Sequence, residues 1–234
     1  MKRRVLVGAA VTLVVVVVLA VGGYYLINSR TFQLAGRIVD RVDTDDKVVA
    51  LTLDDGPTTK APEVLRVLAD AEVPATFYLN GRDLAAHPEF GAAIAAAGHE
   101  IGNHTYTHRR MVFVTPGTVA DEVGRTDAAI RTTGYQGPIT FRPPYGKKLW
   151  TLPKYLSDHD TTTVMWDVEP DSDPSASAEQ IVAQTVREVR PGSIILLHVM
   201  FGNRANSLAA IPGIVAELKA DGYRFVRVSE LLQE

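Results

Sequence analysis

Two adjacent carboxylates, Asp54 and Asp55, stand at the end of an apolar run in the stretch LTLDDGP. Neighbouring like charges repel each other, so a chain that holds both beside a core needs a cation to compensate them. A polar turn or a helix cap is the simpler explanation for such a pair before Gly-Pro. The chemical explanation is that one carboxylate binds a metal ion while the other accepts a proton.

The stretch NHTYTH offers further ligands, His104 and His108. Their spacing allows one helical turn or a tight loop to direct both rings to one point, although an isolated pair is more often a surface feature. With Asp55 they form a set of two imidazoles and one carboxylate, which leaves positions open for water and substrate. We therefore predict a catalytic divalent metal site at Asp55, His104 and His108, with Asp54 as the general base. Zinc is the expected cation, although other divalent ions accept the same ligands.

Two further residues, Arg142 and His198, could assist the same reaction. Arg142 precedes two prolines in FRPPYG; its guanidinium could grip Asp54 through two hydrogen bonds or form an ordinary surface ion pair. His198 ends the apolar run SIILLHV, where a histidine is often a satisfied core residue, but hydrolysis also needs an acid near neutral pH. A carboxylate beside its second ring nitrogen would raise the pKa of His198. The stretch WDVEPDSD supplies four candidates for this carboxylate: Asp167, Glu169, Asp171 and Asp173.

Apolar, β-branched runs alternate with helical patterns through most of the chain. Strands are predicted over residues 48–55, 75–80, 99–104, 139–144, 162–168, 193–199 and 224–228. Helices are predicted over residues 60–71, 88–97, 116–132, 150–158, 177–189 and 207–221. This alternation requires crossover connections and a parallel α/β sheet. Because the candidate polar residues fall at the carboxyl ends of several strands, a barrel with its site at that face is favoured over an open sheet.

The first thirty residues differ from the rest, because the first charged residue after MKRR is Arg30. Residues 5–27 would span roughly 35 Å as a helix, enough to cross a bilayer. We predict a cytoplasmic basic stub over residues 1–4, a transmembrane anchor over residues 5–27 and a juxtamembrane segment over residues 28–45. A cleaved signal peptide is the alternative, although its apolar region should be shorter and end at small residues.

The remaining residues, 46–234, are predicted to form one catalytic domain. The chain has 234 residues, a formal net charge of −3 and no cysteine. This charge gives no indication of nucleic-acid binding, and the absence of cysteine excludes disulfides and thiolate metal sites. With the basic stub in the cytoplasm, the positive-inside rule predicts a single-pass plasma-membrane protein whose domain lies outside.

In their order along the chain, these motifs resemble those of the NodB-homology polysaccharide deacetylases, carbohydrate esterase family 4. The matching stretches are TLDDG, HTYTH, RPPY and LLH. The resemblance implies a distorted (β/α)7 barrel. It assigns the base to Asp54, the metal ligands to Asp55, His104 and His108, the tether of the base to Arg142 and the acid to His198. It also implies that the backbone N–H of Tyr145 helps to form an oxyanion hole, with Pro144 and Trp166 beside the substrate.

The fourth family motif is where this chain departs. The family has D-x-x-D-W, whereas residues 169–173 read EPDSD and no Trp follows. We assign the support of His198 to Asp171, which lies nearest the second Asp of the family motif. The missing Trp changes one wall of the cleft and therefore bears on the length of substrate that fits.

These features together predict a metal-dependent enzyme that hydrolyses N-acetyl groups of a cell-wall or surface polysaccharide of the N-acetylglucosamine type. Acetate and a free amino sugar are the products. Two other functions fit fewer features. A related hydrolase of a small non-sugar amide would have no need of a membrane anchor. An inactive glycan-binding protein would have no need to keep the complete set of candidate catalytic and metal-binding residues.

Overall fold

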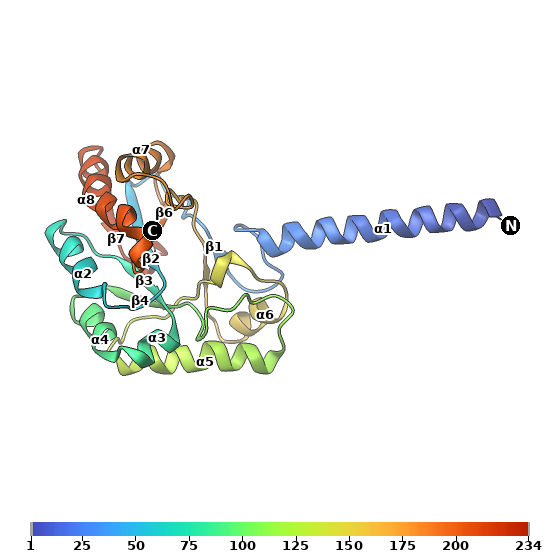
Figure 1. Cartoon of the computed structure of the whole chain (residues 1–234), viewed down its shortest axis with the longest axis horizontal. Coiled ribbons are helices and arrows are strands. Elements are labelled where there is room, and N and C mark those ends of the chain that lie inside the picture. Colours follow the sequence, from blue (N-terminus) through green and yellow to red (C-terminus); the bar gives the residue numbers. More distant parts are fainter. Residues whose placement is uncertain (1, 234) are drawn as a thin grey trace.

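The computed structural model describes residues 2–233, without the side chains of residues 2–6, 8 and 9. A long helix, α1 (Lys2–Asn28), projects from an α/β domain that contains the rest of the described chain (Figure 1). The strands are β1 (Ile38–Val39), β2 (Val48–Asp54), β3 (Thr76–Leu79), β4 (Glu100–Asn103), β5 (Thr163–Val164), β6 (Ile194–His198) and β7 (Arg224–Val226). The α-helices of the domain are α2 (Ala61–Asp70), α3 (Gly81–Ala86), α4 (Pro88–Ala96), α5 (Pro116–Thr132), α6 (Thr151–Asp158), α7 (Ala178–Glu188), α8 (Ala205–Ala220) and α9 (Val228–Leu231).

Strand β2 lies at the centre of a parallel sheet with the order β4-β3-β2-β6, and β7 pairs with its first residues. All seven residues of β2 are buried. Their side chains alternate between two clusters, because successive residues of a strand point to opposite faces. Val49, Leu51 and Leu53 join the main core, while Val48 and Ala50 face a second cluster that includes Trp166. Asp54 lies an even number of residues after Val48 and Ala50 in the same strand, so its carboxylate points to this second face.

Strand pairing is less regular in the part of the chain that would close the sheet between β4 and β6. The expected strand over residues 139–144 is reduced to Phe141, which forms single parallel bridges with Asn103 and Thr163. The prolines that follow have no N–H to donate, so the ladder cannot continue. The expected strand over residues 162–168 is reduced to β5 and a bridge from Val168 to Ile195. The carbonyls after Thr163 accept from the Arg142 side chain instead: Val164 O at 3.2 Å and Met165 O at 2.9 Å.

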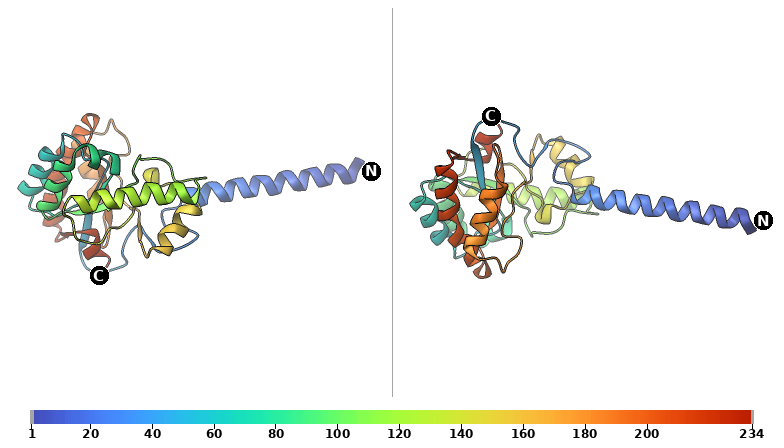
Figure 2. Two further views of the ribbon diagram at one scale, coloured as in Figure 1. Left: turned by 90° about the horizontal axis from the view of Figure 1, so that it is seen from below. Right: turned by 90° about the horizontal axis from the view of Figure 1, so that it is seen from above.

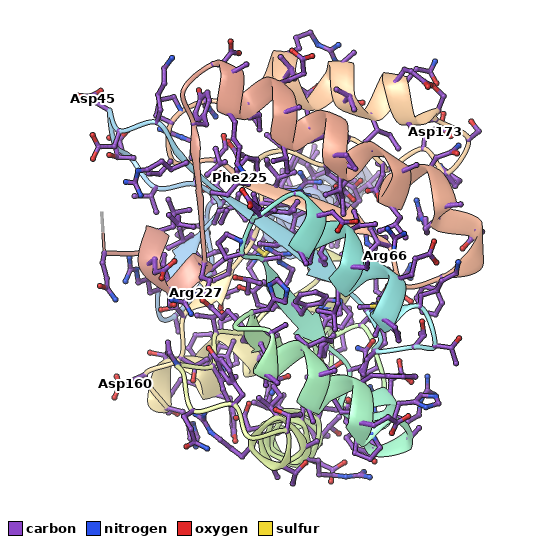
Figure 3. All side chains as sticks on the ribbon, turned by 90° about the vertical axis from the view of Figure 1, so that its left-hand side faces the viewer. Asp45, Arg66, Asp160, Asp173, Phe225 and Arg227 are labelled. Atoms are coloured by element: carbon purple, nitrogen blue, oxygen red, sulfur yellow. The ribbon has the colours of Figure 1, made fainter. Side chains whose placement is uncertain are left out.

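The helices cover the sheet where the sequence predicts them, with shifts of one or two residues at their ends. Their ends follow local signals: Thr115 caps α5 by accepting from the Thr118 N–H, and Ser177 forms a capping box with Gln180 at α7. The short helices α3 and α9 and the strand β1 were not predicted. Figure 3 shows the side of the domain that faces away from α1. This side is formed mainly by α2, α4 and α8, and Arg66 lies on α2.

Helix α1 is apolar, and its described side chains are exposed except near its C-terminal end, where Leu26, Ile27 and Asn28 are partly buried. Its part from Ala10 to Asn28 is long and apolar enough to cross a membrane, and its place near the N-terminus fits a signal sequence equally well. The residues that follow α1 pack on the domain. Strand β1 pairs with β5, and Arg41 donates to the carbonyl of Pro191 at 2.9 Å.

Candidate active site

Most of the candidate residues line one cleft of about 400 Å³, whereas Arg142, Pro144 and Asp171 are buried and are not part of its lining. They come from the carboxyl ends of β2 and β6 and from the loops after β4 and Phe141. The cleft is lined by Arg30, Asp54, Asp55, His104, His108, Tyr145, Trp166, Glu169, Ser172, Leu196, His198 and Arg204. A larger groove of about 680 Å³ lies between α7 and α8. Alanines and valines make up most of its lining, and among the described residues no group of side chains that could hold a metal ion lies there.

Asp55, His104 and His108 each direct one ligand atom to a common point, and these atoms lie within 4.8 Å of one another. Asp55 Oδ1 is 3.3 Å from His108 Nε2 and 3.9 Å from His104 Nε2. The other nitrogen of His104, Nδ1, lies 2.7 Å from the carbonyl of Arg142 and donates to it. This bond fixes the tautomer and leaves Nε2 for a cation, as is usual for a metal ligand. The donor set therefore suits a divalent cation.

Unusual backbone conformations hold these ligands. Asp55 has φ 76° and His108 has φ 58°, and Tyr145 across the cleft has φ 59°. Residues with a Cβ rarely adopt such φ values. These conformations persist where the surrounding structure enforces them. Burial and the neighbouring His104 lower the pKa of His108. The lowered pKa favours the neutral imidazole, which is the form that binds metal.

Asp54 is almost fully buried and meets Arg142, which is completely buried. Nη1 of Arg142 donates to Asp54 Oδ1 at 2.7 Å and to Thr52 Oγ1 at 2.7 Å. The expected two-bond grip is wrong in this respect, because Nε and Nη2 of Arg142 donate to the carbonyls of Val164 and Met165. Asp54 Oδ2 is consequently turned toward the cleft, 3.7 Å from His104 Nε2.

His198 lies beside Asp54, because these two residues are partners in the register of β2 and β6. Its Nδ1 lies 3.3 Å from Asp171 Oδ1, and its backbone N–H donates to Asp171 Oδ2 at 2.7 Å. Ser207 Oγ also donates to Asp171 Oδ2. Burial alone would lower the pKa of His198, but the bond to Asp171 and the charges of Asp54, Asp171 and Asp55 outweigh it and raise the pKa. Burial opposes ionisation of Asp171, yet His198 and Ser207 hold its pKa below the ordinary value.

The other three carboxylates of WDVEPDSD have different partners. Asp167 accepts from the Ile194 N–H and from Ser193 Oγ, so it holds the start of β6. Glu169 accepts from Trp166 Nε1 at 2.7 Å and pairs with Arg30 at 2.7 Å. Asp173 is exposed and accepts from Ser175. The geometry thus favours Asp171 as the partner of His198.

Of the three residues that the resemblance places beside the substrate, Tyr145 and Trp166 line the cleft and Pro144 does not. Tyr145 is 53% exposed and its ring packs 4.7 Å from that of His108, centroid to centroid. Within residues 2–233 its backbone N–H donates to no other group, so this donor is available to a ligand. Trp166 and Pro144 are buried.

Four residues in contact with the candidate residues were not anticipated. Thr52 could have been found, because it lies two positions before Asp54 on the same face of β2. Ser207 and Arg204 approach from the start of α8, and Arg204 donates to the carbonyl of Asp171 at 2.7 Å. Arg30 comes from the segment after α1, and nothing in the sequence indicates that this residue reaches the cleft.

Together, the parallel α/β domain and this cleft bring two histidines and one carboxylate that could hold a cation close to Asp54 and His198, an arrangement typical of a metal-dependent hydrolase. A sequence model of the family described as Polysaccharide deacetylase matches residues 41–164. A peptidoglycan-N-acetylglucosamine deacetylase of Bacillus cereus is 34% identical over 211 residues, which cover 87% of this chain and 97% of that protein. The chain therefore belongs to the polysaccharide deacetylase family, and the predicted family and class of reaction are confirmed.

Solved structures confirm the fold as well. A peptidoglycan N-acetylglucosamine deacetylase superposes with a TM-score of 0.79 at 31% identity, over 83% of this chain and 92% of that chain. A family 4 acetyl xylan esterase of Clostridium thermocellum, solved with a cobalt ion, gives a TM-score of 0.73 at 34% identity, over 80% and 91%. The predicted α/β fold of the deacetylase type is thus confirmed, although the regular ladder within residues 2–233 is not a complete seven-stranded barrel.

Proposed function

We propose that this enzyme removes the acetyl group from N-acetylglucosamine-type sugars of a cell-wall or surface polysaccharide and releases acetate. The observation that carries the proposal is the placement of Asp54 and His198. They face one cleft from neighbouring strands, with the Asp55, His104 and His108 set beside them. A base and an acid on either side of a cation site are what hydrolysis of an amide requires.

Asp54 is the base in this proposal. Its Oδ1 is occupied by Arg142, so Oδ2 accepts the proton of the water that attacks the acetyl carbon. The N–H of Tyr145 donates to the carbonyl oxygen as negative charge develops there. His198, whose Nδ1 is held by Asp171, delivers a proton from Nε2 to the departing amine nitrogen. The C–N bond breaks, and acetate and the free amino sugar leave.

Asp55, His104 and His108 would hold the cation, and we propose zinc because imidazole ligands suit it. A divalent cation bound there would supply polarisation of the acetyl carbonyl and a lower pKa for the attacking water. The choice of metal is tested by replacing zinc with cobalt and other divalent ions. Bound metal and acetate release are measured together for each ion.

We further propose that residues 5–27 stay in the plasma membrane as an uncleaved anchor, with residues 1–4 in the cytoplasm. The apolar length of α1 supports this, as does the cluster Lys2-Arg3-Arg4 before it. The full-length protein should remain with the membrane after a carbonate wash, because a spanning helix is not an electrostatic attachment. A mature chain that begins after residue 25 would show a cleaved signal instead.

Acetate release from a panel of substrates tests the reaction. The panel contains peptidoglycan, N-acetylated chitin oligomers, O-acetylated xylan and small non-sugar amides, each with the metal-loaded protein. Release from the first two supports the proposal. Release from small amides alone would assign the related non-sugar hydrolase, and tight glycan binding without release would assign an inactive binding protein.

A further inference from the structure

The end of helix α1 is built into the active site. The helix ends at Asn28, and two residues later Arg30 lines the same cleft as Asp54 and His198. The guanidinium of Arg30 pairs with Glu169 at 2.7 Å and lies 4.5 Å from the centre of the Trp166 ring. Two residues reach at most about 7 Å. The cleft is therefore held directly beside the end of the apolar helix.

The junction is fastened at further points. The side chains of Lys147 and Lys148 donate to Asn28 Oδ1 and to the carbonyl of Ser29. The backbone N–H of Lys148 donates to the carbonyl of Ile27 at 3.5 Å. Lys148 in turn forms a parallel bridge with Met111. The loop before α5 and the segment before α6 thus lie at the base of α1, and Figures 1 and 2 show both on the side where α1 joins.

Three exposed aromatic side chains surround this junction. Phe32 follows Arg30 by two residues, Phe113 follows Met111 by two, and Trp150 follows Lys148 by two. Their exposed fractions are 56%, 87% and 52%. Phe113 also has φ 54°, a value that a residue with a Cβ rarely adopts. Core packing accounts for Met111 and Leu152 in the same segments, but not for the three rings.

Basic side chains accompany the rings. Arg109 and Arg110 are exposed and precede Met111 in the same loop. Trp and Phe rings on a surface beside the end of an apolar helix are typical of contact with the membrane–water interface, and long basic side chains near such a helix end extend to the head groups. We call the surface formed by Phe32, Phe113, Trp150, Arg109 and Arg110 the anchor face.

We propose that the anchor face lies on the outer surface of the bilayer, with its three aromatic rings in the interfacial layer. The lipid surface is the favoured partner because the face surrounds the exit of a helix that is itself long and apolar enough to span the bilayer. This inference rests on the proposed membrane anchor. It also has a consequence for the substrate: the cleft lies close to the membrane, so the enzyme acts on glycan that lies at the membrane surface.

Tryptophan fluorescence tests the contact, because the chain has only two tryptophans. Trp150 belongs to the anchor face, and Trp166 is 5% exposed in the wall of the cleft. The full-length protein is reconstituted into vesicles of phosphatidylcholine and phosphatidylglycerol, with and without bromine atoms on the upper acyl chains. We expect the brominated lipid to quench wild type, and Trp150→Phe to lose most of that quenching while the emission of Trp166 remains. Equal quenching of wild type and Trp150→Phe would overturn the proposal.

A second pair of variants separates the membrane from other partners. Phe32→Ser combined with Phe113→Ser should lower the quenching of Trp150, whereas Arg66→Glu on the opposite side of the domain should not change it (Figure 3). Turnover of a soluble chitin oligomer should be unchanged in both variants. This turnover does not depend on the membrane, so its loss would show a failure of the reaction itself and not of the membrane contact. A raised KM for the soluble oligomer, with no change in quenching, would assign the rings to glycan binding and refute the membrane contact. Failure of wild type to float with the vesicles would refute both the anchor and the contact.

Discussion

The two sides of the cleft each contain a buried carboxylate with a cationic partner, but the partners differ. Asp54 meets Arg142, whose guanidinium is completely buried and bonded at four acceptors. Asp171 meets His198, whose ring is partly exposed in the cleft. An arginine carries a permanent charge, whereas a histidine gains and loses its proton near neutral pH.

This difference matches the two proposed tasks. A base must stay in place and accept a proton, so a partner of fixed charge on only one of its oxygens serves it well. An acid must itself change charge, so its carboxylate partner tunes the pKa of the ring rather than fixing the charge. The raised pKa of His198 and the lowered pKa of Asp171 are the expected signature of such tuning. Four substitutions can break or sharpen the comparison.

Asp54→Asn should have the largest effect. The amide can still accept from Arg142 but cannot take up the proton of water, so turnover should fall at least about 10²–10⁴-fold, toward background. Bound metal, measured by elemental analysis, should stay near the wild-type amount because Asp55, His104 and His108 are unchanged.

Asp55→Asn is the matched control for that prediction, since it changes the neighbouring carboxylate by the same atoms. It should release much of the metal, because a neutral amide oxygen is a weaker ligand than a carboxylate. Equal metal content in the two variants would show that the assignment of base and ligand is wrong.

His198→Ala should follow, with kcat lowered about 10²–10⁴-fold if proton delivery to the amine is its main task. KM and metal content should change little, because His198 is not among the proposed ligands. An amide or ester substrate with a better leaving group should lose less activity, since it needs less assistance from an acid. An equal loss on both substrates would argue against the role of acid.

Arg142→Met tests the fixed-charge side through stability. It leaves the Asp54 carboxylate buried without its cation, and breaking a buried pair in this way typically costs about 3–5 kcal/mol. The free energy of unfolding in urea should fall by that order. Arg66→Met is the control: its partner Asp70 is exposed, so the change should stay below about 1 kcal/mol. Similar losses in both variants would remove the distinction.

The same comparison explains what could be predicted from the sequence. Asp54, Asp55 and His198 follow apolar runs that form full ladders around β2, so their strands were recognised and their positions at one edge of the sheet followed. The helices were recognised for similar reasons, because their apolar residues recur at helical spacing. The local pattern of apolar residues is sufficient to predict helices and strands where regular backbone hydrogen bonding determines the structure.

The other wall of the cleft could not be predicted in this way. Strands were predicted over residues 139–144 and 162–168, yet the Arg142 side chain donates to the carbonyls that a neighbouring strand would need. That competition depends on a side chain and cannot be read from periodicity. Arg30 is a stronger case, because its place in the cleft depends on how the end of α1 docks on Lys147 and Lys148. Only the three-dimensional structure brings these segments together.

Asp171→Asn should have the smallest effect on activity and the most specific effect on its pH dependence. The protonated ring of His198 is the form that delivers a proton, so activity declines as pH rises through its pKa. In the wild type, Asp171 helps to raise that pKa. The neutral amide removes the anion and favours the neutral ring, so the alkaline limb of the kcat profile should move to lower pH. Below that limb kcat should fall less than in His198→Ala, because the ring is still present.

Two neighbouring carboxylates serve as controls for this shift. Asp167→Asn should leave the limb in place, because Asp167 contacts Ser193 and Ile194 rather than His198, and Asp173→Asn should do the same because Asp173 is exposed. The profiles belong to coupled groups, so the comparison among variants is more informative than any single limb. A limb that moves with Asp167→Asn and stays with Asp171→Asn would transfer the supporting role. If the alkaline limb moves in none of the three variants, no carboxylate sets the pKa of His198. The two sides of the cleft would then differ less than the cationic partners of their carboxylates indicate.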